Sequence, residues 1–484
     1  MNTRKEKDFL GEKKIPHDAL YGIHSLRAQE NFPSNELFSF EWYKSIALTK
    51  LAIYRSVQVF INELKAQYPH QKMPFKMPDE KGLEALILAA TEVSKGEHFK
   101  EFIVPAISGG AGTSFNMNIN EIICNRALQL LNANPGEYEI LDPIEDANIF
   151  QSTNDIIPTS LHVTLMELLT TLENDVNDTR KTLETLEKNY RHTLRVAYTQ
   201  MQQAVPSSYG KLFGAYQEAL SRDWWRISKT QERLKVINLG GSAIGTGLSV
   251  PQFIIFKATE ELRNLSSLPL ARAEQLCDAT MNHDSLVETH AILKAHAVNL
   301  EKMANDLRLL GSDLFKDRSL FIPARQKGSS IMPGKVNPVI CEYVISIAHS
   351  IYANDQLISS LASQGCLELN PYLPTIGHAF IDSLKKLKAA NLSFNEFLLK
   401  GIEIDEELSK KNLFSSPAIT TALVPQLGYH KAEELSKIMK EKNIDIFKAN
   451  EILNFIPQKD LDHLLSPSQL LRLGFKISDC NLEG

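Results

Sequence analysis

The loop at residues 327–338, KGSSIMPGKVNP, gathers residue types that bind and act on anions. Its Asn337, followed by a proline and a long apolar-periodic segment, is a favourable N-cap for a helix. A helix N-terminus attracts anions because its first N–H groups lack intrahelical partners. Lys335 adds a positive charge beside them, and two glycines allow backbone amides to approach a ligand closely. The loop therefore predicts a site for a carboxylate or phosphate, on which Ser329 or Ser330 could act.

An isolated Asn-Pro pair with a lysine is more often a plain capped loop, so the full string carries the argument. It lacks the Gly-x-x-x-x-Gly-Lys-Ser/Thr pattern of nucleotide-binding loops, and residues 245–250 (GTGLSV) do not fit Gly-x-Gly-x-x-Gly. Nucleotide chemistry is therefore disfavoured.

Five further polar or glycine-rich strings occur along the chain. Taken singly, each is more often a tight turn or a helix cap than a binding site. Their joint occurrence favours a function. They are SGGAGTSFNMNINEIICNRA (108–127), QSTNDIIPTS (151–160), TQMQQAVPSSYG (199–210), NLGGSAIGTGL (238–248) and ANDLRLLGS (304–312).

Long amphipathic helices must position these strings. From residue 158 to Tyr190, apolar residues recur at steps of three and four, which predicts one helix of about 30 residues, or about 45 Å. A helix of that length is typical of a bundle. His290 and His296, in a later helical segment, are expected on a solvated face. Five segments with this period predict a central five-helix bundle: 158–190, 208–237, 283–313, 337–364 and 376–402.

The chain is expected to be mainly α-helical and to form three domains. The first, 1–149, mixes short helical patterns with Gly- and Pro-containing segments. The central bundle covers 150–401, and a small helical domain covers 402–484. The apolar stripes of the long helices are broader than one five-helix bundle can bury, so a shared oligomeric core is expected.

Composition narrows the class of partner. The 484 residues are 43% hydrophobic and 23% charged, with a formal net charge of -6, which favours a small diffusible ligand over nucleic acid or a membrane surface. The five cysteines are far apart and include no Cys-x-x-Cys pair, so neither a disulfide framework nor a structural zinc site is expected. The first residues, MNTRKEKDFLGEKK, lack the apolar core of a signal peptide. We expect a cytoplasmic protein.

Together, and in this order, the strings resemble the sequence blocks of the aspartase/fumarase superfamily of lyases, and GSSIMPGKVNP is similar to its signature loop. The similarity covers nearly the whole chain. Residues 15–33, IPHDALYGIHSLRAQENFP, resemble aspartate ammonia-lyases more than fumarases, which usually have Gln in the place of His24. The resemblance implies three domains and a homotetramer whose five-helix bundles merge into a twenty-helix core. It also implies active sites that each draw on three subunits.

The resemblance further implies roles for single residues in the reversible conversion of L-aspartate to fumarate and ammonia. Ser329 would be the base that removes the Cβ proton, and the neighbouring carboxylate would take up the second negative charge of an enediolate. No cofactor is implied, because no Ala-Ser-Gly triplet occurs and no ligand cluster suggests a catalytic metal; weak activation by a divalent cation stays open. The implied substrate contacts are Thr113, Ser152, Thr153 and Ser330 with the β-carboxylate, Lys335, Asn337 and Thr199 with the α-carboxylate, and Asn154 with Thr113 at the amino group.

The resemblance also implies that Gln200 contacts the substrate and that Glu342 supports the site from behind the residues that touch the substrate. These two residues bear on the choice within the superfamily. Fumarases and many aspartases have a histidine at the position of Gln200, paired with a glutamate at the position of Glu342, and in a hydratase that pair is thought to activate water. Gln cannot carry a proton, so malate dehydration is the less favoured alternative.

Two further departures leave the substrate open. Pro105 and Ser108 stand where aspartases usually have an acidic residue and Gln, and Ala324 and Arg325 replace the acidic residue that usually precedes the signature loop. A lyase that releases fumarate from a substituted aspartate is therefore a second alternative. A non-catalytic dicarboxylate-binding scaffold is a third, and the intact signature loop counts against it.

Overall fold

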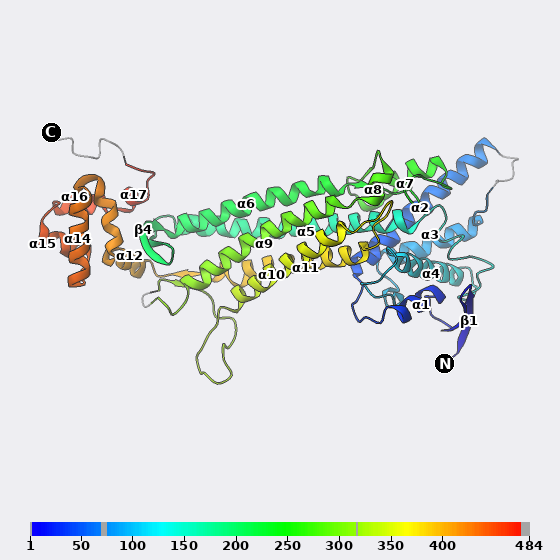
Figure 1. Cartoon of the computed structure of the whole chain (residues 1–484), viewed down its shortest axis with the longest axis horizontal. Helices are drawn as coiled ribbons and strands as arrows, with labels where there is room; N and C mark the ends of the chain where they lie inside the picture. Colours follow the sequence, from blue (N-terminus) through cyan, green and yellow to red (C-terminus); the bar gives the residue numbers. More distant parts are fainter. Residues whose placement is uncertain (1, 69–74, 316–317, 476–484) are drawn as a thin grey trace. The chain divides into compact units, whose positions relative to one another are not determined.

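The computed structural model describes residues 2–68, 75–315 and 318–475, and it confirms a mainly helical chain (Figure 1). The expected division into three domains stays a prediction. No helix in the described residues is long and apolar enough to cross a membrane. The chain groups into two compact units: unit 1 contains residues 1–172, 226–294 and 350–386, and unit 2 contains residues 173–225, 295–349 and 387–484.

Helices account for most of both units. Unit 1 contains α1 (Ile23–Asn31), α2 (Phe40–Gln67), α3 (Glu80–Ser94), α4 (Thr113–Leu130), α7 (Gln252–Ser266) and α8 (Leu276–Met281). Unit 2 contains α12 (Glu406–Ser415), α13 (Val424–Leu427), α14 (Tyr429–Lys442), α15 (Ile446–Leu453), α16 (Gln458–Leu464) and α17 (Pro467–Leu470). Five long helices, which match the five expected from the apolar period, each contribute a segment to both units: α5 (Thr153–Asn189), α6 (Tyr209–Leu234), α9 (Asp284–Leu310), α10 (Val339–Ala362) and α11 (Leu373–Phe397).

Each described strand pairs with one other. Three pairs are antiparallel and one is parallel. The antiparallel pairs are β1 (Thr3–Asp8) with β2 (Gly11–Pro16), β3 (Leu194–Thr199) with β4 (Gln202–Ser208), and β7 (Leu320–Phe321) with β8 (Glu403–Ile404); β5 (Val236–Ile237) runs parallel to β6 (Ala271–Arg272).

An aromatic core in unit 1 fixes α2 against its neighbours. Helix α2 begins after Ser39, whose hydroxyl accepts the N–H of Trp42 at 3.4 Å and so caps one of the unpaired donors. Trp42 is buried, with its ring 5.2 Å from that of Phe38 and 5.7 Å from that of Phe115. Because Phe115 lies in the first turn of α4, this packing holds the start of α4 in place.

Buried carboxylates replace a side-chain cap at the start of α1. The cap residue is Gly22, and Glu121 accepts the N–H groups of Gly22 and His24 at 2.8 Å and of Ser25 at 3.2 Å. A Cβ at position 22 would lie 2.7 Å from Oε1 of Glu121, so only glycine fits. Burial raises the pKa of Glu121 to about 7, even though these donors favour its charged form.

Helix α5 begins five residues earlier than the apolar pattern indicates, and it contains Pro158. Proline has no N–H to donate to the carbonyl of Asn154, four residues before it. Nδ2 of Asn238 donates to that carbonyl at 2.8 Å instead. The long-range bond satisfies the orphaned acceptor and lets the helix start at Thr153.

The prediction that His290 and His296 face solvent is wrong, because both side chains are fully buried. In unit 1, Nδ1 of His290 lies 3.0 Å from Asp355, and Nε2 lies 2.9 Å from the hydroxyl of Ser383. In unit 2, Nδ1 of His296 lies 3.0 Å from Asp223. Each histidine is therefore a buried polar side chain with hydrogen-bonding partners. Burying a polar side chain without such partners would cost free energy.

The C-terminal helices of unit 2 enclose their own apolar core. Leu194 and Val196 of β3 contribute to it, together with Leu413 of α12 and Leu435 of α14. The hydroxyl of Ser409 donates to the carbonyl of Leu194 at 2.7 Å, which fixes β3 against α12. The core therefore anchors the hairpin of β3 and β4, labelled at β4 in Figure 1.

Candidate active site

In unit 1, the predicted contacts with the β-carboxylate lie at the starts of two helices. Thr113 is the first residue of α4, Thr153 is the first residue of α5, and Ser152 directly precedes α5. A Cβ added to Gly112 would lie 2.9 Å from the side chain of Ile157, so the first turns of α4 and α5 are in contact. Two helix N-termini with hydroxyl side chains therefore converge, which is a favourable setting for an anion.

Asp155 holds the start of α5 against the loop that follows β5. Its carboxylate accepts the N–H of Ser152 at 2.9 Å, of Gly240 at 3.2 Å and of Ser242 at 3.0 Å. Nδ2 of Asn154 donates to the carbonyl of Ala243 at 2.8 Å in the same loop. Oδ1 of Asn154 then remains as a hydrogen-bond acceptor. The predicted role of Asn154 needs such an acceptor, because the substrate's amino group donates hydrogen bonds.

Lys50 of α2 lies beneath this segment and is fully buried. Its ammonium donates to Oε1 of Gln151 at 3.0 Å. Burial lowers the pKa of Lys50 to about 7, against the smaller opposing effect of the Asp155 charge. Burial likewise raises the pKa of Asp155 to about 6, although its three backbone donors and Lys50 oppose the change. The pair of Lys50 and Asp155 could not be predicted from the sequence, because its members are 105 positions apart and only the fold brings them together.

In unit 2, Thr199 and Gln200 lie at the exposed end of the hairpin of β3 and β4. Thr199 pairs with Gln202, so the turn has two residues, Gln200 and Met201. Their φ angles are 51° and 62°, which is the left-handed conformation that a type I′ turn requires at both positions. Neither side chain favours that conformation, so the turn stores strain of the kind found at functional sites.

The signature loop is closed at its base by two hydrogen bonds. The N–H of Gly328 donates to the carbonyl of Lys335 at 2.8 Å, and Nδ2 of Asn337 donates to the carbonyl of Gly328 at 2.9 Å. A Cβ at position 328 would lie 2.8 Å from the Lys335 carbonyl oxygen, so the closure needs glycine. Asn337 is therefore a structural part of the loop, and it keeps one N–H free for the predicted carboxylate.

The hydroxyl oxygen of Ser329 accepts two backbone hydrogen bonds. The donors are the N–H groups of Ile331 at 3.2 Å and Met332 at 3.0 Å. Amide donors aimed at an oxygen stabilise negative charge on it. The loop therefore supplies the local condition that a serine base needs. Ser330, next to it, is exposed.

Lys335 and Asn337 line a cleft of about 460 Å³ within unit 2. Arg308 lines it as well and adds positive charge, whereas Arg318, also in the lining, pairs with Asp313. Helix α10 begins at Val339, one residue later than the predicted Asn-Pro start, and Glu342 lies exposed in its first turn. The cleft has the charge and size for a small acid.

Comparison with known proteins identifies the family of this chain. A family model described as a lyase matches residues 11–352. The chain is 36% identical over 475 residues to an aspartate ammonia-lyase of Bacillus subtilis, covering 97% of this chain and 96% of that protein. It is 33% identical over 480 residues to an aspartate ammonia-lyase of Escherichia coli, covering 98% and 97%. The chain belongs to the aspartase/fumarase superfamily of lyases.

Solved structures place the fold in the same superfamily. A fumarate lyase:delta crystallin from Brucella melitensis, bound to cobalt, superposes with a TM-score of 0.89 at 32% identity, covering 98% of this chain and all of that one. A class II fumarase from Schistosoma mansoni gives a TM-score of 0.87 at 25% identity, covering 97% and 99%. The superfamily therefore includes both ammonia-lyases and fumarases among the proteins similar to this chain.

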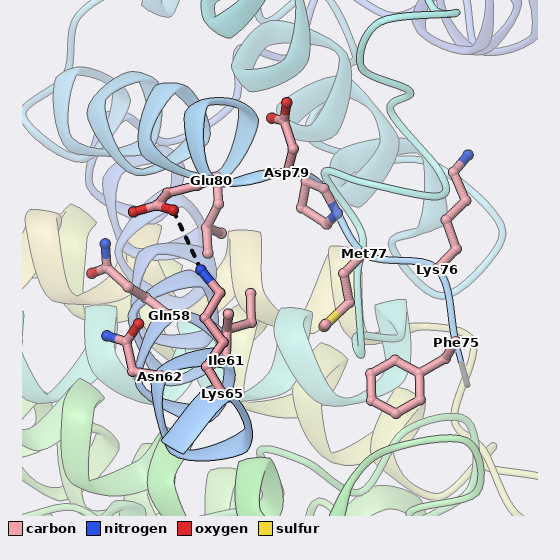
Figure 2. Close-up of a pocket in the computed structure, with 11 residues that line it drawn as sticks. Gln58, Ile61, Asn62, Lys65, Phe75, Lys76, Met77, Asp79 and Glu80 are labelled. Atoms are coloured by element: carbon pink, nitrogen blue, oxygen red, sulfur yellow. Dashed lines mark hydrogen bonds and ion pairs between the residues drawn. The ribbon is translucent and has the colours of Figure 1, made fainter. Parts of the chain in front are cut away.

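A second cavity, of about 460 Å³, lies in unit 1 between the end of α2 and the start of α3, apart from the predicted residues of this superfamily member (Figure 2). Gln58 and Asn62 line one side, and Phe75 and Met77 line the other. Lys65, on the same helix, pairs with Glu80 at 3.3 Å. The charged groups of the cavity's lining already have partners in the described residues, since Asp79 accepts the N–H of Gly82 at 2.7 Å and Lys76 pairs with Glu145.

One group of side chains in the described residues has the spacing of metal ligands. It consists of Glu92, Glu97 and His98. Arg126 already pairs with Glu92 through two bonds of 2.6 and 3.0 Å, and this ion pair explains the arrangement. None of these residues belongs to the predicted site.

Proposed function

We propose that the protein is an aspartate ammonia-lyase, which converts L-aspartate reversibly to fumarate and ammonia. The observation that carries the proposal is the pair of amides on the hydroxyl oxygen of Ser329, in a loop that matches the signature of the superfamily. The two aspartate ammonia-lyases at 36% and 33% identity support the choice of substrate.

The first step removes a proton from Cβ of aspartate. Ser329 acts as an alkoxide, stabilised by the N–H groups of Ile331 and Met332, and it takes that proton to become a hydroxyl. The electron pair of the C–H bond moves into the β-carboxylate, which becomes an enediolate with two negative charges. The hydroxyls of Thr113, Ser152 and Thr153, at the starts of α4 and α5, would hold this carboxylate, with Ser330 from the signature loop. Their interaction strengthens as charge develops, which is the condition for lowering the barrier.

The second step breaks the bond between Cα and nitrogen. The enediolate collapses, the Cα–Cβ double bond of fumarate forms, and the electron pair of the C–N bond leaves with the amine. Asn154 and Thr113 would hold the departing amino group, and Lys335, Asn337 and Thr199 the α-carboxylate. These groups orient the substrate so that the Cβ proton faces the base.

The same chemistry requires no cofactor, because the substrate's own carboxylate accepts the electrons. We therefore propose a cofactor-independent enzyme in which a divalent cation has at most a weak activating effect. We also propose a homotetramer with composite active sites, for which light scattering should give about four times the chain mass of 54.4 kDa.

Malate dehydration is the second candidate, favoured by the structural similarity to a class II fumarase. It needs a group that exchanges a proton with water. The turn carries Gln200 where such a group would lie, and an amide cannot act as that acid or base. Aspartate is therefore favoured over malate as the substrate.

The test follows fumarate by its ultraviolet absorbance, and ammonia in parallel, with L-aspartate or L-malate as substrate. Equal amounts of fumarate and ammonia from aspartate alone are expected. Ser329→Ala should lower kcat by about 100-fold or more while leaving binding of a dicarboxylate largely intact. Ser346→Ala is the matched control, since that hydroxyl only bonds the carbonyl of Glu342.

Three results would redirect the assignment. Fumarate from malate would make the protein a fumarase. Turnover of a substituted aspartate but not of aspartate would identify another fumarate-releasing lyase. Dicarboxylate binding without turnover of any of them would favour a non-catalytic scaffold, and normal turnover by Ser329→Ala would remove the serine base.

A further inference from the structure

Arg195, on β3, is a nearly buried cation without a charged partner. Arg195 is 8% exposed, and the carbon of its guanidinium group lies 5.3 Å from the centre of the Tyr209 ring. Among the described residues, the guanidinium of Arg195 makes no hydrogen bond and no ion pair. A charge removed from water in this way costs several kcal/mol unless a counter-charge and donors compensate it. A ring face offsets only part of that cost.

Arg195 faces a small polar cavity inside unit 2, with a volume of about 40 Å³. One water needs about 10–15 Å³ by a comparable measure, so the cavity holds more than a single water. Its walls come from three parts of the unit. They are β3 with the start of α6 (Arg195, Tyr198, Tyr209), the segment around β7 (Arg318, Ser319) and α12 (Ser409).

The cavity carries an excess of positive charge. Arg318 pairs with Asp313 and lies over the ring of Phe321 at 5.4 Å, so its charge is balanced. The hydroxyls of Tyr209 and Ser319 bond each other at 2.9 Å. Arg195 is the cation whose charge these contacts leave uncompensated.

We propose that this cavity binds a small oxyanion, with the guanidinium of Arg195 as its principal ligand. A guanidinium presents parallel N–H donors that match the two oxygens of a carboxylate or phosphate, and burial strengthens such a bond. The same chemistry could come from inorganic phosphate or from the carboxylate end of a small acid. The cavity is distinct from the cleft that contains Lys335, although Arg318 lines both.

Occupancy would connect two parts of unit 2 that carry predicted catalytic groups. Strand β3 ends at Thr199, four residues after Arg195, and β7 precedes the signature loop by six residues. Helix α12, labelled in Figure 1, closes the cavity through the bond of Ser409 to Leu194. An anion held among these elements should reduce the local opening of the hairpin.

The test is calorimetric titration of the full-length protein with sodium phosphate and, separately, with sodium succinate, at an ionic strength kept constant with chloride. An anion that binds elsewhere on the chain should bind Arg195→Gln as well as it binds wild type. Binding to the cavity is therefore the binding that is present in wild type and lost in Arg195→Gln. We expect at least one of the two anions to bind the cavity, with a dissociation constant at least tenfold larger in Arg195→Gln. Arg222→Gln, which removes an exposed cation from α6 of the same unit, should stay within twofold of wild type.

Hydrogen exchange locates the binding independently of activity. Protection of amides in residues 194–208 by the anion is expected in wild type and not in Arg195→Gln. Phosphate alone would identify an inorganic ligand, and succinate alone a carboxylate. If neither anion exceeds chloride, or if Arg195→Gln binds both as tightly as wild type, the proposal is overturned.

A second variant is titrated in the same way if Arg195→Gln folds poorly. Arg195→Lys keeps the charge but loses the planar pair of donors, so it should bind the anion about tenfold more weakly. Unchanged binding by this variant would rule out the guanidinium as the ligand.

Discussion

Replacing Lys50 with methionine should change how stability depends on pH. Lys50 is fully buried, and its pKa in the folded protein is about 7 against an ordinary value of 10.5. Between these two values the unfolded chain binds one more proton at this residue than the folded chain. By linkage, the free energy of unfolding therefore rises with pH in this window, by up to about 1.4 kcal/mol per pH unit. Below pH 7 both states carry the proton, and the full cost of the buried charge remains.

The magnitude follows from these two pKa values. From pH 7.5 to 9.5, Lys50 should add about 2.5 kcal/mol to the wild-type free energy of unfolding. Lys50→Met lacks this contribution, so the difference between wild type and variant should shift by that amount across the two pH units. The shift should favour wild type at the higher pH. Any constant loss from the missing bond to Gln151 cancels in the comparison.

Urea unfolding followed by circular dichroism at pH 7.5, 8.5 and 9.5, at one protein concentration, measures this difference. Lys65→Met is the matched control, because Lys65 lies on the same helix with its side chain 58% exposed and should show no such trend. A difference between wild type and Lys50→Met that stays constant within about 0.5 kcal/mol would refute a buried, titrating Lys50.

Three other substitutions test the supports of the site. Asp155→Asn weakens the acceptor of three backbone N–H groups, so unfolding should become easier by about 1–3 kcal/mol and kcat/KM for aspartate should fall at least tenfold, measured by urea unfolding and fumarate absorbance. Met201→Gly relieves a left-handed residue in the hairpin turn and should stabilise the protein by about 1 kcal/mol in thermal unfolding; a loss of stability would argue against the strained turn. Gly22→Ala forces a methyl group against the carboxylate of Glu121 and should cost about 2 kcal/mol or more, whereas Gly365→Ala, whose nearest neighbour would be 3.5 Å away, should be nearly neutral.

The helices could be predicted from the sequence because their signal is local. Apolar residues at steps of three and four gave α5, α6, α9, α10 and α11 with small errors at the ends. The start of α5 was misplaced for a physical reason. Pro158 normally marks the first turn of a helix. The donor that allows five helical residues before it, Asn238, is 84 positions away from Asn154.

The candidate site could be predicted where its geometry lies within one loop. The closure of residues 328–337 and the amides on Ser329 both form between near neighbours in sequence. Lys50 and Asp155, which hold the segment that contains Ser152 and Asn154, could not be predicted as a pair. They come together only through tertiary packing. The two buried histidines were assigned to solvent for the same reason, because a polar residue on an amphipathic helix is buried only when a distant partner exists.

The partners of five buried ionisable side chains distinguish Arg195 from the other four. Asp155 and Glu121 each receive three backbone N–H groups, Lys50 has an amide oxygen, and His290 has a carboxylate and a hydroxyl. Each of these groups has the partner that lowers the cost of its burial. Arg195 alone among these five has a ring face and an open polar cavity instead. Since the fold compensates the other four from its own residues, the missing counter-charge at Arg195 is best supplied by a ligand, and a ligand-free protein should gain rather than lose stability when this arginine is replaced by glutamine.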